Sequence, residues 1–250
     1  MKLGQVLATR TNKKIYHVDD TVIKIFEKGY PKSMILNEAL NQSRVEETGL
    51  KIPNIRAVGN IDGCWSITMD YIPGKTLDEM FKENPDKSDE LLELFVDLQI
   101  EMHTKTAPLL NKLKDKLARQ IQSIKDLDAT TKYELLTRLD SMSKHTKLCH
   151  GDFLPSNIII NDSGSYILDW SHATQGNASG DVATTYLKMT LYNPELANRY
   201  VKLFCKKSDT ALQYVQKWLP IVAAQQYLKS TSEEEKVFLH KWLNVIDFQG

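Results

Sequence analysis

Apolar and polar residues alternate near the N-terminus, and this period of two is typical of β-strands with one buried face. Residues 3–8, 14–18 and 21–26 follow the pattern, and residues 55–58 and 64–69 repeat it further along the chain. Polar turn residues separate neighbouring segments, so consecutive strands are expected to pair antiparallel. The pattern therefore predicts a small antiparallel sheet in the first third of the chain.

A different period governs most of the remaining chain. Apolar residues recur every three or four positions, which is the spacing of one face of an α-helix. One such helix, residues 33–48, lies among the strands, and Gly49 closes it. Further helices are expected at residues 77–82, 88–103, 109–127, 131–142, 182–191, 194–204, 208–219, 221–230 and 233–245. These patterns predict an α+β protein with a small strand-rich part and a larger, mainly helical part.

Two short apolar strands interrupt the helical part within residues 148–170, LCHGDFLPSNIIINDSGSYILDW. Residues 158–160 and 166–168 are rich in β-branched and aromatic side chains, and a polar turn that contains a glycine separates them. These features predict a β-hairpin.

Three side chains that carry oxygen lie at or near the open end of this hairpin. Pairing of the strands brings Asn157, just before the first strand, beside Asp169, just after the second. An amide oxygen and a carboxylate suit Mg²⁺, which takes a few protein oxygens and completes its shell with phosphates and water. Asp152, on the loop that leads into the same end, is free to face a substrate hydroxyl. This set of groups indicates phosphoryl transfer, in which one Asp handles the nucleophile while an Asn and an Asp hold metal.

The alternative is that these residues only build turns, because Gly-Asp and Asp-Gly pairs near hairpins are common turn chemistry. All three side chains occur together at these spacings, with apolar strands between them, and this combination favours the catalytic interpretation.

The stretch also resembles the H-G-D-x-x-x-x-N and D-W signatures of the aminoglycoside phosphotransferase and choline kinase-like family, which are relatives of protein kinases. The resemblance spans nearly the whole chain. It implies a two-lobed, protein-kinase-like fold, with a nucleotide-binding lobe at residues 1–74, a hinge near residues 69–74 and a C-terminal lobe at residues 75–250. The C-terminal lobe would carry the catalytic loop, the metal site and the acceptor pocket, and the active site would lie in the cleft between the lobes.

The resemblance assigns roles to two charged residues of the N-terminal part. Lys24 lies in the motif VIKIF, which is similar to the third strand of the family, whose lysine contacts the α and β phosphates of the nucleotide. Glu38, in the early turns of the predicted helix 33–48, is the best candidate to hold this lysine. Taken alone, Lys24 fits an exposed strand edge and Glu38 fits a solvated helix face, which is the commonest place for a glutamate.

The nucleotide-binding assignments also include a hinge and a loop. By resemblance, adenine would bind the carbonyl of Asp70 and the N–H of Ile72, where an apolar strand breaks at a Pro-Gly pair. Many kinases cover the phosphates with a glycine-rich loop, but the chain has no glycine between Gly4 and Gly29. Thr11 is the candidate for phosphate contacts from this loop.

Composition narrows the range of partners. The 250 residues carry 32 Lys and Arg against 32 Asp and Glu, so the formal net charge is zero. A balanced chain lacks the basic field of a general nucleic-acid binder and the acidity that attracts polycations, which weighs mildly against an aminoglycoside acceptor. The three cysteines, Cys64, Cys149 and Cys205, fit neither a disulfide framework nor a zinc site. No signal peptide or membrane span is evident, so a cytoplasmic location is expected.

The sequence therefore predicts a phosphotransferase that uses ATP and Mg²⁺ to phosphorylate a hydroxyl of a small molecule. Catalysis would rest on Asp152. The alternatives are a non-catalytic nucleotide-binding module, suggested by the glycine-poor loop, and a choline, amino-alcohol or sugar kinase of the same fold. A protein kinase is less favoured, since no long activation segment follows Asp169.

Several C-terminal residues bear on the acceptor, whose identity the sequence leaves open. Asp181 is expected to cap the helix 182–191. Four aromatic residues would suit a choline-like acceptor, namely Trp218, Tyr227, Trp242 and Phe248, but their helical spacing favours packing in the core. An acidic run, Glu233 to Glu235, would suit an aminoglycoside, but its position favours the N-terminus of a helix.

Overall fold

The computed structural model describes residues 4–243 and shows a mixed α+β protein with two compact units. The first unit contains the chain up to Pro85 together with Pro155–Ala173, and the second contains Asp86–Leu154 and the chain from Thr174 onward. The first unit is therefore discontinuous in sequence. The predicted lobe boundary between residues 74 and 75 stays a prediction.

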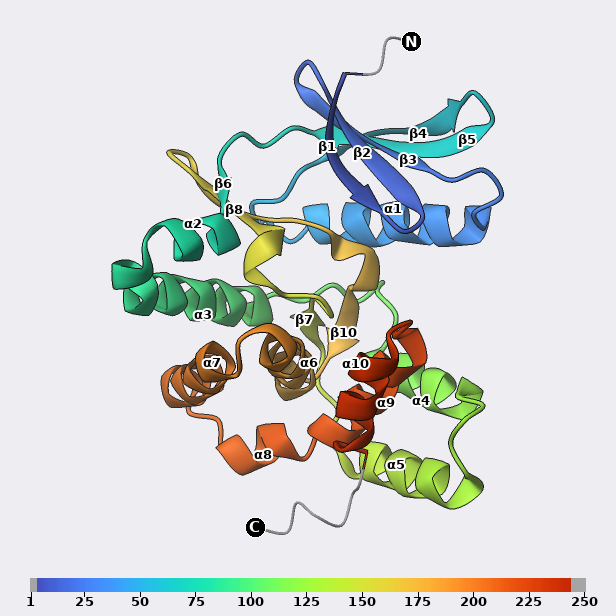
Figure 1. Ribbon diagram of the computed structural model, residues 1–250, viewed down its shortest axis with the longest axis vertical. Helices are drawn as coiled ribbons and strands as arrows, with labels where there is room; N and C mark the ends of the chain where they lie inside the picture. Colours follow the sequence, from blue (N-terminus) through green and yellow to red (C-terminus); the bar gives the residue numbers. More distant parts are fainter. Residues whose placement is uncertain (1–3, 244–250) are drawn as a thin grey trace. The chain divides into compact units, whose positions relative to one another are not determined.

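A five-stranded antiparallel sheet dominates the first unit, in the spatial order β1-β2-β3-β5-β4. Its strands are β1 (Gln5–Arg10), β2 (Lys13–Val18), β3 (Thr21–Phe26), β4 (Ile55–Ile61) and β5 (Cys64–Asp70). Helix α1 (Lys32–Glu46) lies along one face of the sheet (Figure 1). Between them lies a hydrophobic core made of Phe26, Ile35, Ala39, Ile67 and Met69. The alternating pattern of the sequence thus fixes which side of each strand the helix covers.

A second, three-stranded sheet completes the first unit and carries the predicted hairpin. It contains β6 (Lys75–Thr76), β8 (Ile158–Asn161) and β9 (Gly164–Ile167), in the order β6-β8-β9. Short 3-10 turns precede and follow the hairpin at Pro155–Asn157 and Trp170–His172. Helix α2 (Leu77–Glu83) starts with a capping box, in which Thr76 and Glu79 exchange hydrogen bonds.

The second unit is mainly helical. Its helices are α3 (Ser88–Thr104), α4 (Leu113–Ser123), α5 (Ala129–Ser141), α6 (Ala178–Tyr192), α7 (Pro194–Ser208), α8 (Leu212–Gln216), α9 (Leu219–Lys229) and α10 (Glu233–His240), and a 3-10 turn at Pro85–Lys87 precedes α3. Two short strands, β7 (Lys147–Cys149) and β10 (Thr174–Gly176), pair antiparallel. Helix α6 is buried along most of its length, with Val182, Ala183 and Leu187 fully enclosed, and it packs against α7, α8 and α9.

The predicted and observed elements agree for the first five strands, the hairpin and most helices, and the two largest differences are helices that are shorter than predicted. The predicted helix 109–127 is only Leu113–Ser123, because Asn111 and Lys112 are extended and pair with Gln175. The predicted helix 208–219 is only Leu212–Gln216, because α7 runs on to Ser208 and Asp209 then takes a left-handed conformation. The last helix ends at His240, earlier than the predicted residue 245.

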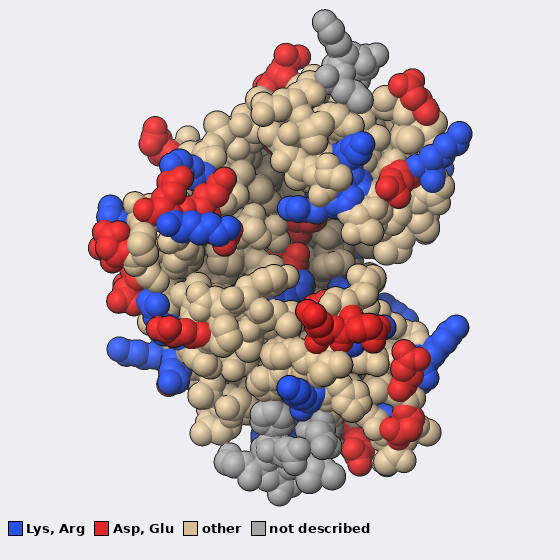
Figure 2. Space-filling view, viewed as in Figure 1, with Lys and Arg blue, Asp and Glu red and all other residues tan. Residues whose placement is uncertain are grey.

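Charged side chains of both signs are intermixed over the face that Figure 2 presents, in keeping with the balanced composition. None of the described helices combines the length and the apolar character needed to span a bilayer.

Candidate active site

The predicted hairpin is present and brings its two polar ends together. Ile158 pairs with Ile167 and Asn161 with Gly164, so the turn between the strands contains two residues. Beyond the last strand pair, the Leu168 N–H donates to the Asn157 carbonyl at 2.8 Å. Asn157 therefore lies beside the residue that precedes Asp169, as the sequence predicted.

Asp169 takes a conformation that few non-glycine residues adopt. Its φ is +60° and its ψ is +68°, in the left-handed region, where Asp and Asn are enriched and where function often justifies the strain. The next residue, Trp170, is fully buried, and its indole N–H donates to the Ile167 carbonyl at 3.0 Å. The side chain of Asn41 on α1 donates to the Ser171 carbonyl at 3.1 Å. Packing on both sides of the turn thus holds the Asp169 backbone in place.

The predicted pair between Lys24 and Glu38 is present at 2.8 Å. The Lys24 ammonium also lies 3.5 Å from the Asp169 carboxylate. Burial alone would lower the pKa of Lys24, but the charges of Asp169 and Glu38 outweigh it and raise the pKa to about 12. Lys24 therefore remains a buried cation at any physiological pH. The alternative of an exposed edge lysine is wrong, since only 6% of the residue surface is accessible.

Glu38 binds a second lysine that the sequence analysis missed. Both oxygens of its carboxylate lie 3.1 Å from the Lys13 ammonium. Lys13 opens β2, directly after the turn at Thr11 and Asn12. No local signal marks this lysine, because its partner lies 25 residues away in sequence and on another element.

A cavity of about 180 Å³ in the first unit gathers most of the predicted nucleotide-side residues. Lys24, Asp70, Ile72, Asn157 and Asp169 all line it. Apolar side chains complete its walls on both sides, namely Ile15, Val22 and Met69 from the five-stranded sheet and Ile159 and Leu168 from the hairpin. Apolar walls with a few convergent polar groups are typical of a site for a planar ligand with charged substituents.

The hinge assignment concerns main-chain groups of Asp70 and Ile72. The Asp70 side chain is already engaged, since it accepts hydrogen bonds from Asn54 at 2.8 Å and from Arg56 at 2.5 Å. Burial would raise the pKa of Asp70, but these hydrogen bonds hold it below its usual value. A ligand in the cavity thus meets the backbone rather than a free carboxylate at this position.

Thr11 is placed less favourably than the other predicted residues. It is exposed in the tight turn between β1 and β2 and does not line the cavity, whereas Arg10 and Lys13 on either side of the turn do. Arg10 and Lys13 thus bring cationic side chains to the cavity beside this turn, and the predicted role of Thr11 stays a prediction.

The donor set at the hairpin end fits Mg²⁺. Asn157 and Asp169 offer an amide and a carboxylate oxygen, which are hard ligands. Within residues 4–243 no cluster of three or more His, Cys, Asp or Glu side chains could hold a metal without help. A pair of oxygens suits a cation that also binds nucleotide phosphates, because Mg²⁺ sites in kinases use few protein ligands.

Asp152 lies in the second unit, on the loop after β7. Gly151 before it has a φ of +78°, which a residue with a side chain rarely adopts. The Asp152 N–H donates to the Nδ1 of His150 at 3.1 Å, and the His150 ring is completely buried. Phe153 behind it packs against Phe95 with ring centroids 4.8 Å apart. The Asp152 carboxylate is therefore carried on a rigid loop.

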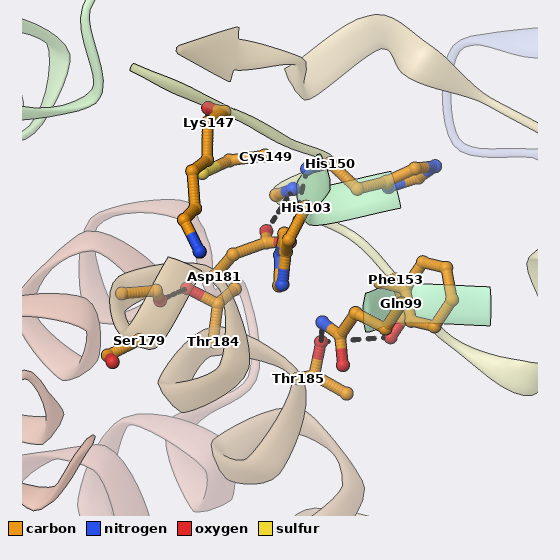
Figure 3. A network of polar contacts seen from close by, with 12 residues as sticks. Gln99, His103, Lys147, Cys149, His150, Phe153, Ser179, Asp181, Thr184 and Thr185 are labelled. Carbon is orange, nitrogen blue, oxygen red and sulfur yellow. Dashed lines mark hydrogen bonds and ion pairs between the residues drawn. The ribbon is translucent and has the colours of Figure 1, made fainter. Parts of the chain in front are cut away.

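The carboxylate of Asp181 holds this loop from behind (Figure 3). It accepts hydrogen bonds from the backbone N–H of Gly151 at 2.7 Å and of His150 at 3.2 Å, and it lies 3.0 Å from Nε2 of His103. Burial opposes the charge, but His103 and the Gly151 N–H keep the pKa of Asp181 below its usual value. Asp181 is a buried, ionised brace for the loop that carries Asp152.

The predicted role of Asp181 as a helix cap is wrong. Helix α6 begins four residues earlier than expected, at Ala178, and Asn177 is its cap, accepting from the Ser179 N–H at 3.0 Å. Asp181 falls in the first turn and points to the loop. Asn was a plain capping signal, whereas the contacts of Asp181 span about 30 residues of sequence and left no local pattern.

Helix α6 contributes two more groups to the same loop. Thr185 donates to the Phe153 carbonyl at 3.0 Å, and the Lys188 ammonium pairs with the Asp152 carboxylate. Asp181, Thr185 and Lys188 are spaced four and three residues apart, so they share one helix face. The sequence analysis missed Lys188, because a helix lysine is usually solvated.

The residues considered for acceptor recognition have varied surroundings. Trp218 is completely buried and belongs to the core. Trp242 packs edge-on against Tyr186. The acidic run forms the first turn of α10, which Ser232 caps, as expected. Phe248 lies outside the described residues. The three cysteines are free thiols, of which Cys149 is buried and the other two are half-buried.

Comparison with known proteins identifies the family. Residues 5–218 match the model of the phosphotransferase enzyme family. The chain belongs to this family. A search among curated protein sequences finds no match for this phosphotransferase family member.

Solved structures share the fold of this family member at low sequence identity. A thermostable mutant of aminoglycoside phosphotransferase APH(4)-Ia, in ternary complex with ADP and hygromycin B, aligns with a TM-score of 0.71 at 10% identity, covering 96% of this chain and 90% of that one. The ADP-bound aminoglycoside phosphotransferase APH(2'')-Ib gives 0.63 at 16% identity, with 98% and 94% covered. A choline/ethanolamine kinase family protein from Mesorhizobium loti gives 0.63 at 14% identity, with 96% and 85% covered. The two-lobed kinase-like α+β fold predicted from the sequence is confirmed.

Proposed function

We propose that this protein is an ATP- and Mg²⁺-dependent phosphotransferase that moves the γ-phosphate to a hydroxyl of a small molecule. The observation that carries the proposal is the cavity of the first unit, an apolar slot that Lys24, Asn157 and Asp169 line. Similar structures include complexes with ADP and with AMP-PNP, which supports a nucleotide as the ligand of this slot.

On the nucleotide side, the proposed roles follow from charge and position. The apolar walls take the adenine ring, whose edge binds the Asp70 carbonyl and the Ile72 N–H. Lys24, held by Glu38 at 2.8 Å, binds the α and β phosphates. Asn157 and Asp169 hold Mg²⁺, which when bound neutralises the charge that develops on the phosphates.

On the acceptor side, Asp152 is the catalytic base. It orients the acceptor hydroxyl and takes its proton as the oxygen attacks the γ-phosphorus. The bond from that phosphorus to the β-phosphate oxygen breaks, and ADP leaves with the electron pair. The brace from Asp181 to the His150 and Gly151 amides fixes the position of the base, and in phosphoryl transfer positioning matters more than base strength.

The test compares nucleotide binding with turnover. Asp152→Ala is expected to lower phosphotransfer by about 100-fold or more while nucleotide affinity stays close to that of the wild type. Asp169→Ala is expected to lose Mg²⁺-dependent affinity for ATP, measured by calorimetry. A parallel series with GTP in place of ATP measures the nucleotide preference. Asp162→Ala, in the exposed turn of the hairpin, is the matched control and should behave as the wild type.

Two outcomes would reject the proposal. Equal phosphotransfer by the wild type and by Asp152→Ala would remove the base. If the protein bound nucleotide but showed no ATP turnover with any acceptor, and not even slow turnover without one, a non-catalytic nucleotide-binding module would be favoured instead.

A further inference from the structure

A second cavity, of about 180 Å³, opens within the second unit beside the loop of Asp152. Gly151, the residue before Asp152, lines it, and so does Lys188, whose ammonium pairs with the Asp152 carboxylate. The remaining walls come from the end of α9 and the start of α10, including Gln226, Lys229 and Glu235. The cavity therefore adjoins the proposed catalytic base.

The charges around this cavity are unusual for an acceptor site of a cationic antibiotic. Two of its lysines, Lys188 and Lys229, stand against one carboxylate, Glu235, which already accepts from the Ser230 hydroxyl at 2.6 Å. Lys188 is engaged with Asp152. Lys229 makes no hydrogen bond and no ion pair with any residue in the described part of the chain.

The positive charges of neighbouring lysines also lower one another's pKa. Loss of surrounding water and the charge of the Lys188 ammonium, partly opposed by the charge of Asp152, lower the pKa of Lys229 to about 8. Lys116 on α4 has its pKa lowered to about 7, first by burial and then by Lys229. Like charges brought together in this way are stabilised by an anion that binds between them.

Gln226 provides an independent sign of a ligand. Only 5% of its surface is accessible, and its amide nitrogen donates to the Thr184 carbonyl at 3.3 Å. Its Oε1 is buried and has no hydrogen-bond partner among residues 4–243. A buried acceptor without a partner costs free energy, and an O–H or N–H group of a molecule in the cavity would remove that cost.

We propose that this cavity is the acceptor site and that it takes a small alcohol carrying an anionic group, either a carboxylate or a phosphate. Lys229 and Lys188 bind the anionic group, and Gln226 accepts a hydrogen bond from a hydroxyl or amine of the same molecule. The reacting hydroxyl is presented to Asp152, which Lys188 releases as it turns to the anion. This inference rests on the proposed phosphotransferase function and names its substrate class.

The first experiment compares acceptors of similar size and different charge. ADP release from Mg·ATP is measured with glycerol, glycerate, glycerol 3-phosphate and choline. We expect kcat/KM for glycerate or glycerol 3-phosphate to exceed that for glycerol and choline by about tenfold or more, since a hydrogen bond to a charged group is worth that much. The two anionic compounds distinguish a carboxylate from a phosphate. Faster turnover of choline or of an aminoglycoside such as streptomycin would overturn the inference.

The second experiment measures anion binding without any choice of alcohol. At constant ionic strength, inorganic phosphate or acetate should raise the melting temperature of the wild type by about 2–4 °C at several times Kd. Lys229→Gln should lose this shift and Lys229→Arg should keep it. Lys202→Gln, an exposed lysine of α7 outside the cavity, removes the same charge and should respond as the wild type.

The results separate the two proposals. An equal response of Lys229→Gln and the wild type, or no response of the wild type to either anion, would overturn the anionic acceptor. Nucleotide binding and slow ATP turnover of the wild type without acceptor test the phosphotransferase proposal alone, and they can succeed while the anionic acceptor fails.

Discussion

Replacement of Asp181 by Asn should weaken the support of the loop that carries Asp152, the proposed catalytic base. The carboxylate accepts three contacts, with His150 and His103 on one oxygen and Gly151 on the other. An Asn side chain has the same shape but only one oxygen. Its NH2 group must therefore face N–H donors that bind the second carboxylate oxygen in the wild type. Because the site is buried and charged, we expect a loss of about 3–5 kcal/mol in the free energy of unfolding, as for a broken buried pair.

Urea unfolding measures this loss as a lower midpoint with an unchanged slope. A phosphotransfer assay on the folded variant should show a reduced kcat, while nucleotide affinity stays close to that of the wild type because Asp181 is not among the residues that line the proposed nucleotide cavity. Asp97→Asn is the matched control, since it breaks a half-exposed pair with Lys207 and should cost no more than about 1 kcal/mol. If Asp181→Asn destabilised the protein no more than Asp97→Asn, the buried-brace argument would fail.

Three further changes have expected outcomes. Glu38→Gln removes the main carboxylate partner of Lys24 and should lower the free energy of unfolding by about 3 kcal/mol, measured by urea unfolding, and weaken nucleotide binding, measured by calorimetry. Gly74→Ala should cost about 1–3 kcal/mol in the same unfolding assay, because the φ of Gly74 is +143° and a Cβ would lie 2.4 Å from the Ile160 carbonyl oxygen. Lys116 has a folded-state pKa of about 7, below its unfolded value of about 10.4, so the unfolded chain binds more protons above pH 7. The free energy of unfolding should therefore rise between pH 7 and 8. Over this range the urea midpoint should rise less in Lys116→Met than in the wild type. An equal rise of the midpoint in the two proteins would contradict the burial of this ammonium.

The sequence predicted the parts of the site that are encoded locally. Asn157 and Asp169 were placed together because two β-branched strands and a polar turn lie between them, and pairing is determined within that short stretch. The strand that carries Lys24 was predicted from the alternation of apolar and polar residues, whereas the ion pair between Lys24 and Glu38 was predicted from the family resemblance.

The parts that the sequence did not predict depend on distant contacts. Strands β7 and β10 contain three residues each and pair across a separation of about 25 residues, so neither shows a usable alternation. Lys13, Lys188 and Lys229 resemble ordinary surface lysines in sequence, and only the folded chain shows what surrounds them. Tertiary context overrode helical spacing at Asn111 and Lys112, where pairing with Gln175 delays the start of α4.

The split composition of the first unit constrains how the nascent chain can fold. Its five-stranded sheet and α1 emerge from the ribosome early, but β8 and β9, which Asn157 and Asp169 flank, follow only after residues 86–154 have been made. Until then β6 has no partner strand, and the cavity of the first unit lacks the wall that the hairpin provides. If the cavity binds ATP as proposed, the nucleotide cannot stabilise the early fragment as it would the finished protein. Chains that stop before residue 158 should then be recognised by chaperones and proteases as unfinished.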